Sequence, residues 1–551
     1  MTIVNYGKKR FLIVDNIKPS RDALKQLAIS LNATRIDSTL YPNDVITMCQ
    51  NITYDIIFLG YDLGEDQKNG QQILEELKIT GGISRQCIVI IITAEVSQEM
   101  VLAALEHKPD DYLTKPYTLN DLTTRLDRCI KKKSSMAEIY QALDDKNSAK
   151  VFRLCEQKIR SGDNHKLECL GIKSRQHFDH QQLKQAKKIY LTYQDTPNCQ
   201  WAMIGLGKIA LLEKDTQYAI SLFRQLIENS PLYLSSYDWL AQAYLTLDQF
   251  DNAEKTLDKA IQISPRSVVR QKAFADICFN NDHYEKSAFA YLTANDLAYN
   301  SIHHNPSNAL NFARALIEYT ADIDIHQAKK LNNKAFKALG IMTKEFKKIE
   351  LKIQTHLLSA CLYKNTKEYR QSSDMLKEAK KTLDKLDENV SPISLVEMSK
   401  SFIKLDENRA ANQLMTSLIE RCHDDLLLMT EIDKLEECPD ISDISKAQRA
   451  LNVAANLYKN RDYSAAIKKL RRALLLYPSH IGIRLNLLQV LLVSFEMKPD
   501  DLIKIEQASA IIISFNNIEQ NNRSYLRFEK LKDKYKHLKQ ACFGPEIQMK
   551  K

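Results

Sequence analysis

Residue types suited to phosphoryl chemistry follow short apolar runs in the first quarter of this 551-residue chain. An aspartate, Asp15, comes directly after one run, a threonine, Thr93, ends another, and a lysine, Lys115, follows a third. Carboxylate oxygens are preferred ligands of Mg²⁺, and a lysine together with a hydroxyl can hold phosphoryl oxygens. These side chains can act together only if the fold brings the ends of the runs to one place.

The apolar runs predict strands that do this. Phe11–Val14, Ile56–Leu59, Ile88–Ile92 and the shorter Asp111–Thr114 are separated by stretches in which apolar residues recur at helical spacing. Continuous apolar strands that alternate with helices indicate a parallel sheet covered on both faces. The site of such a sheet lies at the carboxyl ends of its strands, where Gly60 joins the three residues named above.

The segment 8–130 resembles the receiver domain of bacterial two-component response regulators, in the words FLIVDN, DIIFLGYDLG, IIITAE and DYLTKPY. The resemblance implies a flavodoxin-like, five-stranded parallel sheet that holds Mg²⁺ and takes a phosphoryl group on an aspartate. It makes Asp15 a metal-site acid, Thr93 the hydroxyl switch and Tyr112 the aromatic switch. Lys115 becomes the phosphoryl-binding lysine, and the resemblance implies a cis peptide bond to the proline that follows it.

Two departures from the receiver pattern bear on function. Asn16 stands where a second acid is expected, and Gly60 stands at the phosphoacceptor position. Glycine offers neither a nucleophile nor a metal ligand, and Mg²⁺ affinity falls with the number of ligand charges. We therefore expect no cofactor, or weak Mg²⁺ binding through Asp15, and no phosphoryl transfer at the usual position.

Asp62 is the alternative acceptor. It lies two residues beyond Gly60 and eight before Gly70, where many receivers have a turn glycine. If the strand slipped by two residues, Asp62 could enter the site, but the strand would then run through Gly60 and Tyr61 in a poorer apolar pattern. The interpretation that we prefer is a loop aspartate that makes a turn contact, which leaves a pseudo-receiver.

A 34-residue repeat dominates the next part of the chain. Pro197, Pro231 and Pro265 are spaced by that period. Small and large residues recur within the frame at Gly207, Ala219 and Phe223, at Ala241, Ala253 and Leu257, and near the C-terminus at Ala454, Ala466 and Leu470. This resembles the tetratricopeptide (TPR) pattern of two antiparallel helices per repeat, which must stack into a solenoid to bury its apolar faces. We expect six to eight such helix pairs.

The fold class is therefore multidomain, an α/β receiver followed by an all-α TPR solenoid. The predicted segments are a degenerate receiver (1–133), a helical linker with a weak repeat (134–199), TPR repeats (200–301), divergent helical pairs (302–446), a further repeat (447–480) and C-terminal capping helices (481–551).

Composition narrows the functions and the compartment that we expect for this chain. The net charge of +9 is too dilute over this length to indicate nucleic-acid binding. Eleven scattered cysteines without a Cys-x-x-Cys pair are typical of a reducing compartment. We expect a cytoplasmic protein, because there is neither a signal sequence nor a run of 18 apolar residues.

Other clusters offer weaker signals. Lys468, Lys469, Arg471 and Arg472 form the densest basic patch, either a solvated helix face or a docking patch for an acidic partner. Four short motifs are more typical of structural positions than of phosphate or metal sites: Gly205–Lys208, His177–His180, Cys422–Asp425 and His303–His304. We find no enzyme signature and expect no enzymatic activity.

The function implied by the resemblance is that of a signalling adaptor. Its receiver would dock a sensor histidine kinase or another response regulator, and could thereby inhibit transfer to a competent regulator. It could also form a homodimer through the face built from 97–107, 111–114 and 119–130. The TPR groove would capture a peptide or helix. Two alternatives remain open, a phosphorylation-gated switch that uses Asp62 and a TPR scaffold or co-chaperone unconnected to a phosphorelay.

Overall fold

Five parallel strands form the predicted sheet, in the order β2-β1-β3-β4-β5. The strands are β1 (Arg10–Val14), β2 (Arg35–Thr39), β3 (Ile56–Gly60), β4 (Ile88–Thr93) and β5 (Asp111–Thr114). This is a computed structural model, and it describes residues 6–64, 66–94, 106–386, 390–422, 451, 453–476, 481–497, 502–513, 515 and 525–543.

Both faces of the sheet are buried, which explains why its central strands are continuously apolar. Alternate residues of β1, such as Leu12 and Val14, pack with α2 and α3, whereas Phe11 and Ile13 pack with α1 and α5. The covering helices are α1 (Lys18–Ser30), α2 (Pro42–Asn51), α3 (Gly70–Ile79) and α5 (Leu119–Asp144), and a short 3₁₀ turn η1 (Tyr6–Lys8) precedes β1.

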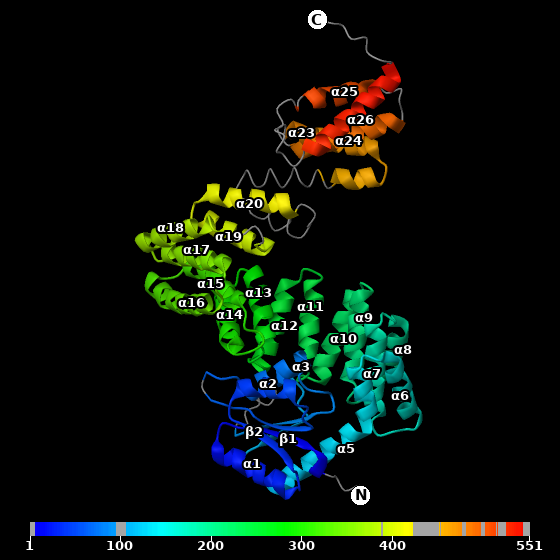
Figure 1. Ribbon diagram of the computed structural model, residues 1–551, viewed down its shortest axis with the longest axis vertical. Helices are drawn as coiled ribbons and strands as arrows, with labels where there is room; N and C mark the ends of the chain where they lie inside the picture. The colour runs from blue at the N-terminus through cyan, green and yellow to red at the C-terminus, as the bar shows by residue number, and fades with distance from the viewer. Residues whose placement is uncertain are drawn as a thin grey trace. The chain divides into compact units, whose positions relative to one another are not determined.

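Helix α5 belongs to both parts of the chain. Its first half packs on the sheet through Leu122 and Leu126, and its second half packs against the repeats through Met136 and Ile139. A capping box fixes its start, because the Thr118 side chain accepts from the backbone of the third helical residue. The boundary predicted after residue 133 falls inside this helix, which continues from the receiver into the segment predicted as a helical linker (Figure 1).

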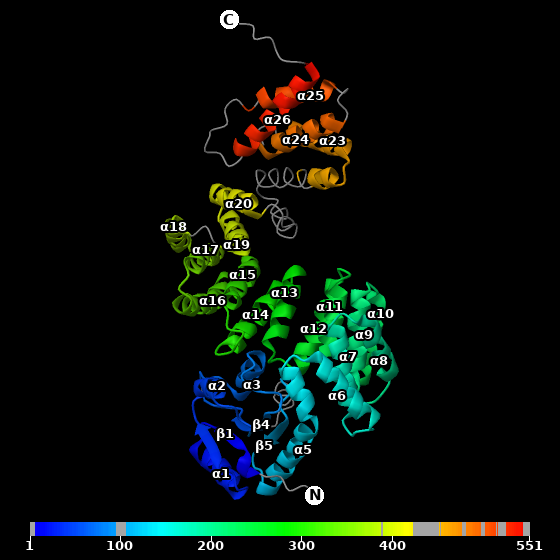
Figure 2. The ribbon, with the colours of Figure 1, turned by 45° about the vertical axis from the view of Figure 1, so that its right-hand side comes forward.

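Antiparallel helix pairs follow α5 and make up the rest of a first compact unit, residues 1–346 (Figure 2). Their bounds are α6 (Ser148–Arg160), α7 (Lys166–Asp179), α8 (Leu183–Tyr193), α9 (Gln200–Leu212), α10 (Thr216–Asn229), α11 (Ser235–Leu245), α12 (Phe250–Ile263), α13 (Val268–Asn280), α14 (Tyr284–Ala298), α15 (Pro306–Ala321) and α16 (Ile325–Glu345).

The 34-residue period is visible in the backbone. Lys214, Asp248 and Asp282 are spaced by that period, and each has a positive φ, between 55° and 64°, where the first helix of a pair ends. A residue in the left-handed region stops a helix and turns the chain back. The period seen in the prolines therefore marks a repeated turn as well as a repeated packing pattern.

A second unit covers residues 347–551. Its helices are α17 (Ile349–Asn365), α18 (Tyr369–Leu383), α19 (Pro392–Lys404), α20 (Asn408–Cys422), α23 (Tyr463–Leu476), α24 (Ile481–Met497), α25 (Leu502–Ile513) and α26 (Tyr525–Phe543). The division between the units falls inside the segment 302–446, which the sequence treats as one stretch of divergent pairs. Within the described residues, no helix is long and apolar enough to cross a membrane.

The first testable prediction concerns close helix packing. A Cβ atom added at Gly207 would lie 2.3 Å from the Phe223 ring, whereas one added at Gly340 would meet nothing within 4 Å. Gly207→Ala should lower the free energy of unfolding by about 1–3 kcal/mol through overpacking. Gly340→Ala, also in a helix of the first unit, should raise it by about 0.5–1 kcal/mol.

Urea unfolding followed by tryptophan fluorescence checks this pair. The chain's two tryptophans, Trp201 and Trp239, lie in α9 and α11 and so report on the first unit. Equal effects of the two substitutions would show that the close packing at Gly207 carries no energetic weight.

Candidate functional site

Asp15 lies at the carboxyl edge of the sheet, directly after β1, and is almost fully buried. Its Oδ1 accepts a hydrogen bond from the Ile17 backbone N–H at 2.8 Å, and its Oδ2 accepts one from Ser20 Oγ at 2.6 Å. Lys115 Nζ reaches the same Oδ2 at 2.9 Å. The fold therefore brings two of the predicted site residues together as an ion pair.

Gly60 is the last residue of β3, and it lies beside that pair. A Cβ atom placed at Gly60 would lie 3.0 Å from the Val14 carbonyl oxygen and 3.5 Å from Asp15 Cα. The start of α3 packs on it from the other side, because a Cβ at Gly70 would lie 2.3 Å from the Gly60 oxygen. The backbone is thus closely packed where the resemblance implies a phosphoacceptor side chain.

Thr93, Tyr112 and Asn16 complete the predicted set. Thr93 is buried at the end of β4, and its carbonyl accepts from the Lys115 backbone N–H at 2.7 Å. Tyr112 in β5 is half-buried and packs against the hydrophobic cluster between the sheet and the helices α2 and α3. Asn16 Oδ1 is buried without a hydrogen-bond partner among the described residues. The peptide bond between Lys115 and Pro116 is cis, as the resemblance implied.

Asp62 lies apart from these contacts. Its side chain is exposed, and its Oδ1 accepts from the Gly64 backbone N–H at 3.0 Å within its own loop. The neighbours on either side, Tyr61 and Leu63, are buried instead. The observed geometry is a turn contact of the loop.

The donor set around Asp15 is a poor one for Mg²⁺. Both carboxylate oxygens already accept hydrogen bonds, one of them also pairs with a lysine, and the second ligand position holds a neutral amide, Asn16. Hard divalent cations need several carboxylate or carbonyl oxygens. Nor do the described parts of the chain place three or more His, Cys, Asp or Glu side chains where they could hold a metal ion.

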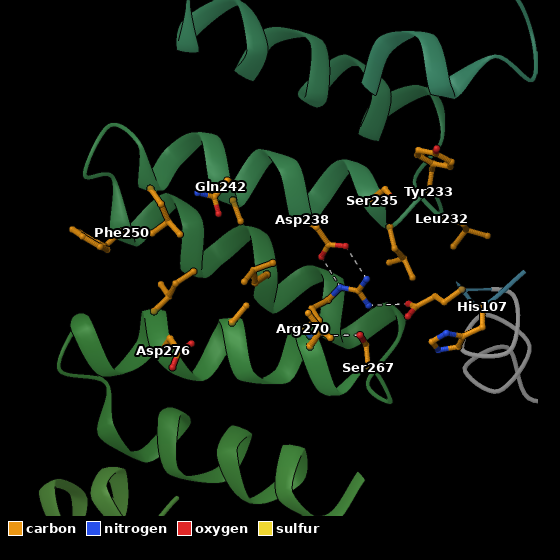
Figure 3. Close-up of a pocket in the computed structure, with 18 of the residues that line it drawn as sticks. His107, Leu232, Tyr233, Ser235, Asp238, Gln242, Phe250, Ser267, Arg270 and Asp276 are labelled. Atoms are coloured by element: carbon orange, nitrogen blue, oxygen red, sulfur yellow. Dashed lines mark hydrogen bonds and ion pairs between the residues drawn. The ribbon is translucent and has the colours of Figure 1, made fainter. Parts of the chain in front are cut away.

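A second candidate site is a cavity of about 1070 Å³ that runs along α11 and α13 (Figure 3). One part of its wall is apolar and includes Leu245, Phe250 and Ile277. Its charged part is centred on Arg270, whose side chain is only 6% exposed. No pattern in the sequence marks this cavity, because Arg270 has no distinctive motif around it.

Two acids hold the Arg270 guanidinium. Asp238 of α11 accepts from Nε and Nη2 at 2.8 and 3.0 Å, and Glu106, which follows β4 in the chain, accepts from Nη1 at 2.8 Å. Burial alone would lower the pKa of Arg270, but the two carboxylates raise it, so the group stays charged. A buried, fully paired arginine of this kind is a fixed anchor in the cavity wall.

The basic patch lies in the second unit. Lys468 and Lys469 of α23 are exposed, and Arg471 donates a hydrogen bond to Gln507 of α25. The Arg472 side chain lies outside the described residues. The patch is therefore exposed in part, and one of its members is tied to a neighbouring helix.

Among the short motifs, Gly205 and Gly207 lie within α9, where their Cβ positions would meet aromatic rings, and serve helix packing. The two histidines of 177–180 bond to Gln182 and Ser148. The motif Cys422–Asp425 lies almost wholly outside the described residues. His303 precedes α15, as expected of a helix boundary, and also contacts Glu75 of α3.

Comparison with known families agrees with this geometry. Residues 11–127 match the response regulator receiver domain, and residues 234–267 match the tetratricopeptide repeat. The matched receiver segment contains the whole sheet edge described above, and the matched repeat contains α11 and α12.

Curated relatives match the N-terminal part. The transcriptional regulatory protein CiaR of Streptococcus pneumoniae is 38% identical over 85 residues, 15% of this chain and 36% of CiaR. The response regulator MprA of a Mycobacterium species is 25% identical over 125 residues, 23% of this chain and 52% of MprA. The chain thus spans about half, or less, of the length of the curated relatives that it matches.

Solved structures match the same region. The response regulator DrrB of Thermotoga maritima is 23% identical, with 23% of this chain and 54% of DrrB covered and a TM-score of 0.20. A receiver domain protein of Methanospirillum hungatei is 21% identical, with 23% and 96% covered and a TM-score of 0.20. The two family matches assign residues 11–127 of this chain to a response-regulator receiver domain and residues 234–267 to a tetratricopeptide repeat.

Proposed function

We propose that this chain is a two-component signalling adaptor that acts by binding proteins, without enzymatic activity and without phosphoryl transfer at the usual receiver position. The observation that carries the proposal is Gly60. It ends β3 beside the Asp15–Lys115 pair, at the place where a phosphoacceptor carboxylate would have to stand. Glycine has no side-chain oxygen that could attack a phosphoryl donor.

The Asp15–Lys115 ion pair supports a receiver held in one state. In a phosphorylated receiver a lysine would pair with the new phosphoryl oxygens. Here Lys115 already pairs with the nearest carboxylate at 2.9 Å, and that carboxylate also accepts from Ser20 and Ile17. The charges at the sheet edge are thus compensated within the chain, and any Mg²⁺ held there would be bound weakly.

Protein binding would then use two surfaces. The receiver would dock a sensor histidine kinase or another regulator, as its resemblance implies. The cavity along α11 and α13 would take a peptide or a helix, since it joins an apolar wall to fixed charges at Asp238 and Arg270. Clefts of that composition are typical binding sites.

Intact mass spectrometry tests the absence of phosphoryl transfer. We expect no mass gain when the full chain is incubated with Mg²⁺ and acetyl phosphate, while a receiver with an intact acceptor gains one phosphoryl group in the same tube. The Asp62→Ala variant serves as the comparison. A gain of one phosphoryl group in the wild type that is lost in this variant would restore the phosphorylation-gated switch.

The role of the ion pair gives a further prediction. Lys115→Met should lower the free energy of unfolding by about 1–3 kcal/mol, because it leaves a buried carboxylate with fewer partners. Lys9→Met is the matched control, since Lys9 pairs with Asp55 where both side chains are 38% exposed, and it should cost at most about 0.5 kcal/mol. Urea unfolding followed by circular dichroism measures both.

A negligible effect of Lys115→Met would mean that the lysine is free to serve another ligand. That result would weaken the proposal of a receiver held in one state by its own charges.

A further inference from the structure

The receiver is docked onto the repeats through the N-terminal half of α3 and the loop before it. The Gln72 side-chain amide donates to the carbonyls of Leu297 and Tyr299 at 3.1 and 3.2 Å. From the other direction, Asn300 Nδ2 donates to the Asp66 carbonyl at 2.7 Å. These bonds join the receiver to the α14–α15 connection, more than 220 residues away in the chain.

Glu75 of α3 forms the first side-chain contact of this interface that involves a carboxylate. Its Oε1 lies 2.7 Å from His303 Nε2 of the repeats and 3.7 Å from His107 Nδ1 of the receiver. Its side chain is only 15% exposed. Burial alone would raise the pKa of Glu75, but the hydrogen bond with His303 and the charge of His107 lower it, so the carboxylate is ionised at neutral pH.

Glu106 forms the second such contact, an ion pair with Arg270. Its carboxylate accepts from Arg270 Nη1 at 2.8 Å, and the two side chains are 18% and 6% exposed. Arg270 itself is held in place by Asp238. The repeats thus hold the Arg270 guanidinium in position to pair with the receiver. We call the pairs Glu75–His303 and Glu106–Arg270 the latch.

The hydrogen bonds and ion pairs of this docking come from Gln72, Glu75, Asn300 and Glu106, so it relies on polar and charged groups. Interfaces of that character resemble those of reversible complexes and of domains that move relative to each other. The latch therefore has the composition of a contact that opens and closes, unlike the apolar core of α5 that joins the same two parts.

The docked receiver also closes one end of the cavity. Glu106, His107 and Lys108 belong to its wall, together with Ser235 of α11 and Val269 of α13 (Figure 3). A peptide that followed the cavity along α13 would reach these receiver residues at its charged end. Docking and full access to the cavity thus compete for the same space.

We propose that the receiver is an autoinhibitory cap on the repeat groove, held by the latch, and that opening the latch exposes the charged end of the groove around Arg270. The inference rests on the proposed function of the groove as the partner site. It adds that the receiver controls this site through its position, with no need for a phosphoryl group.

Hydrogen–deuterium exchange of the full chain tests the cap. In the double variant Glu75→Gln/Glu106→Gln, amides in 267–272 and 296–304 should exchange about tenfold faster than in the wild type, because local opening becomes easier.

Glu76→Gln is the matched control. Glu76 is the neighbour of Glu75 on α3, but its partner is Lys68 of the receiver itself, at 2.5 Å. Exchange in 267–272 and 296–304 should therefore stay at the wild-type rate. The variant Asn300→Ala, which removes the bond to the Asp66 carbonyl, should accelerate exchange in 66–75 without changing any charge.

Wild-type exchange in the double variant Glu75→Gln/Glu106→Gln would overturn the cap. Faster exchange throughout the first unit would also overturn it, since the contacts would then support folding as a whole. Hydrogen–deuterium exchange does not depend on phosphoryl transfer. A mass gain in the acetyl phosphate experiment would therefore reject the proposed function, while the exchange rates alone would decide on the cap.

Discussion

The ion pair between Lys115 and Asp15 is the interaction on which the receiver site depends. It connects the ends of β5 and β1, which are separated in the sheet by β3 and β4. The pair therefore spans the position where Gly60 ends β3. Gly60 has no side chain that could lie between them, and the charges of the lysine and the buried carboxylate compensate each other. A site built in this way keeps the architecture of a switch while satisfying its own charges.

Two different joints connect the receiver to the repeats. Helix α5 carries buried apolar side chains along both halves, so separating the parts there would expose core surface. The latch at Glu75 and Glu106 consists of polar groups whose hydrogen bonds water can replace once the two parts separate. A permanent joint on one side and a replaceable joint on the other leave the receiver attached while one of its faces can be released.

The sequence predicts much of this fold because burial leaves a periodic trace. Strands β1, β3 and β4 are covered on both faces and read as continuous apolar runs, and the repeats show their helix crossings as small residues. Strand β2 lacks such a trace, since most of its residues, Arg35 to Thr39, are at least partly exposed at the sheet edge. The segment boundary predicted after residue 133 falls within helix α5, where Lys131 and Lys132 are exposed while Met136 and Ile139 of the same helix are buried.

Contacts between distant segments leave no local pattern at all. Arg270 and Glu106 are 164 residues apart, and neither is unusual among its neighbours. His303 could be identified only as a residue before a helix. The continuous helix α5 sets a condition that these contacts must meet. Each residue of an α-helix turns the chain by about 100° and advances it by about 1.5 Å. Adding or removing one residue near its middle would swing the repeats around the receiver and carry Arg270 and His303 away from their acids. The length of α5 thus fixes the rotation of the repeats about the helix axis relative to the receiver. Insertions in α5 should be tolerated only where they add whole helical turns, which restore that rotation.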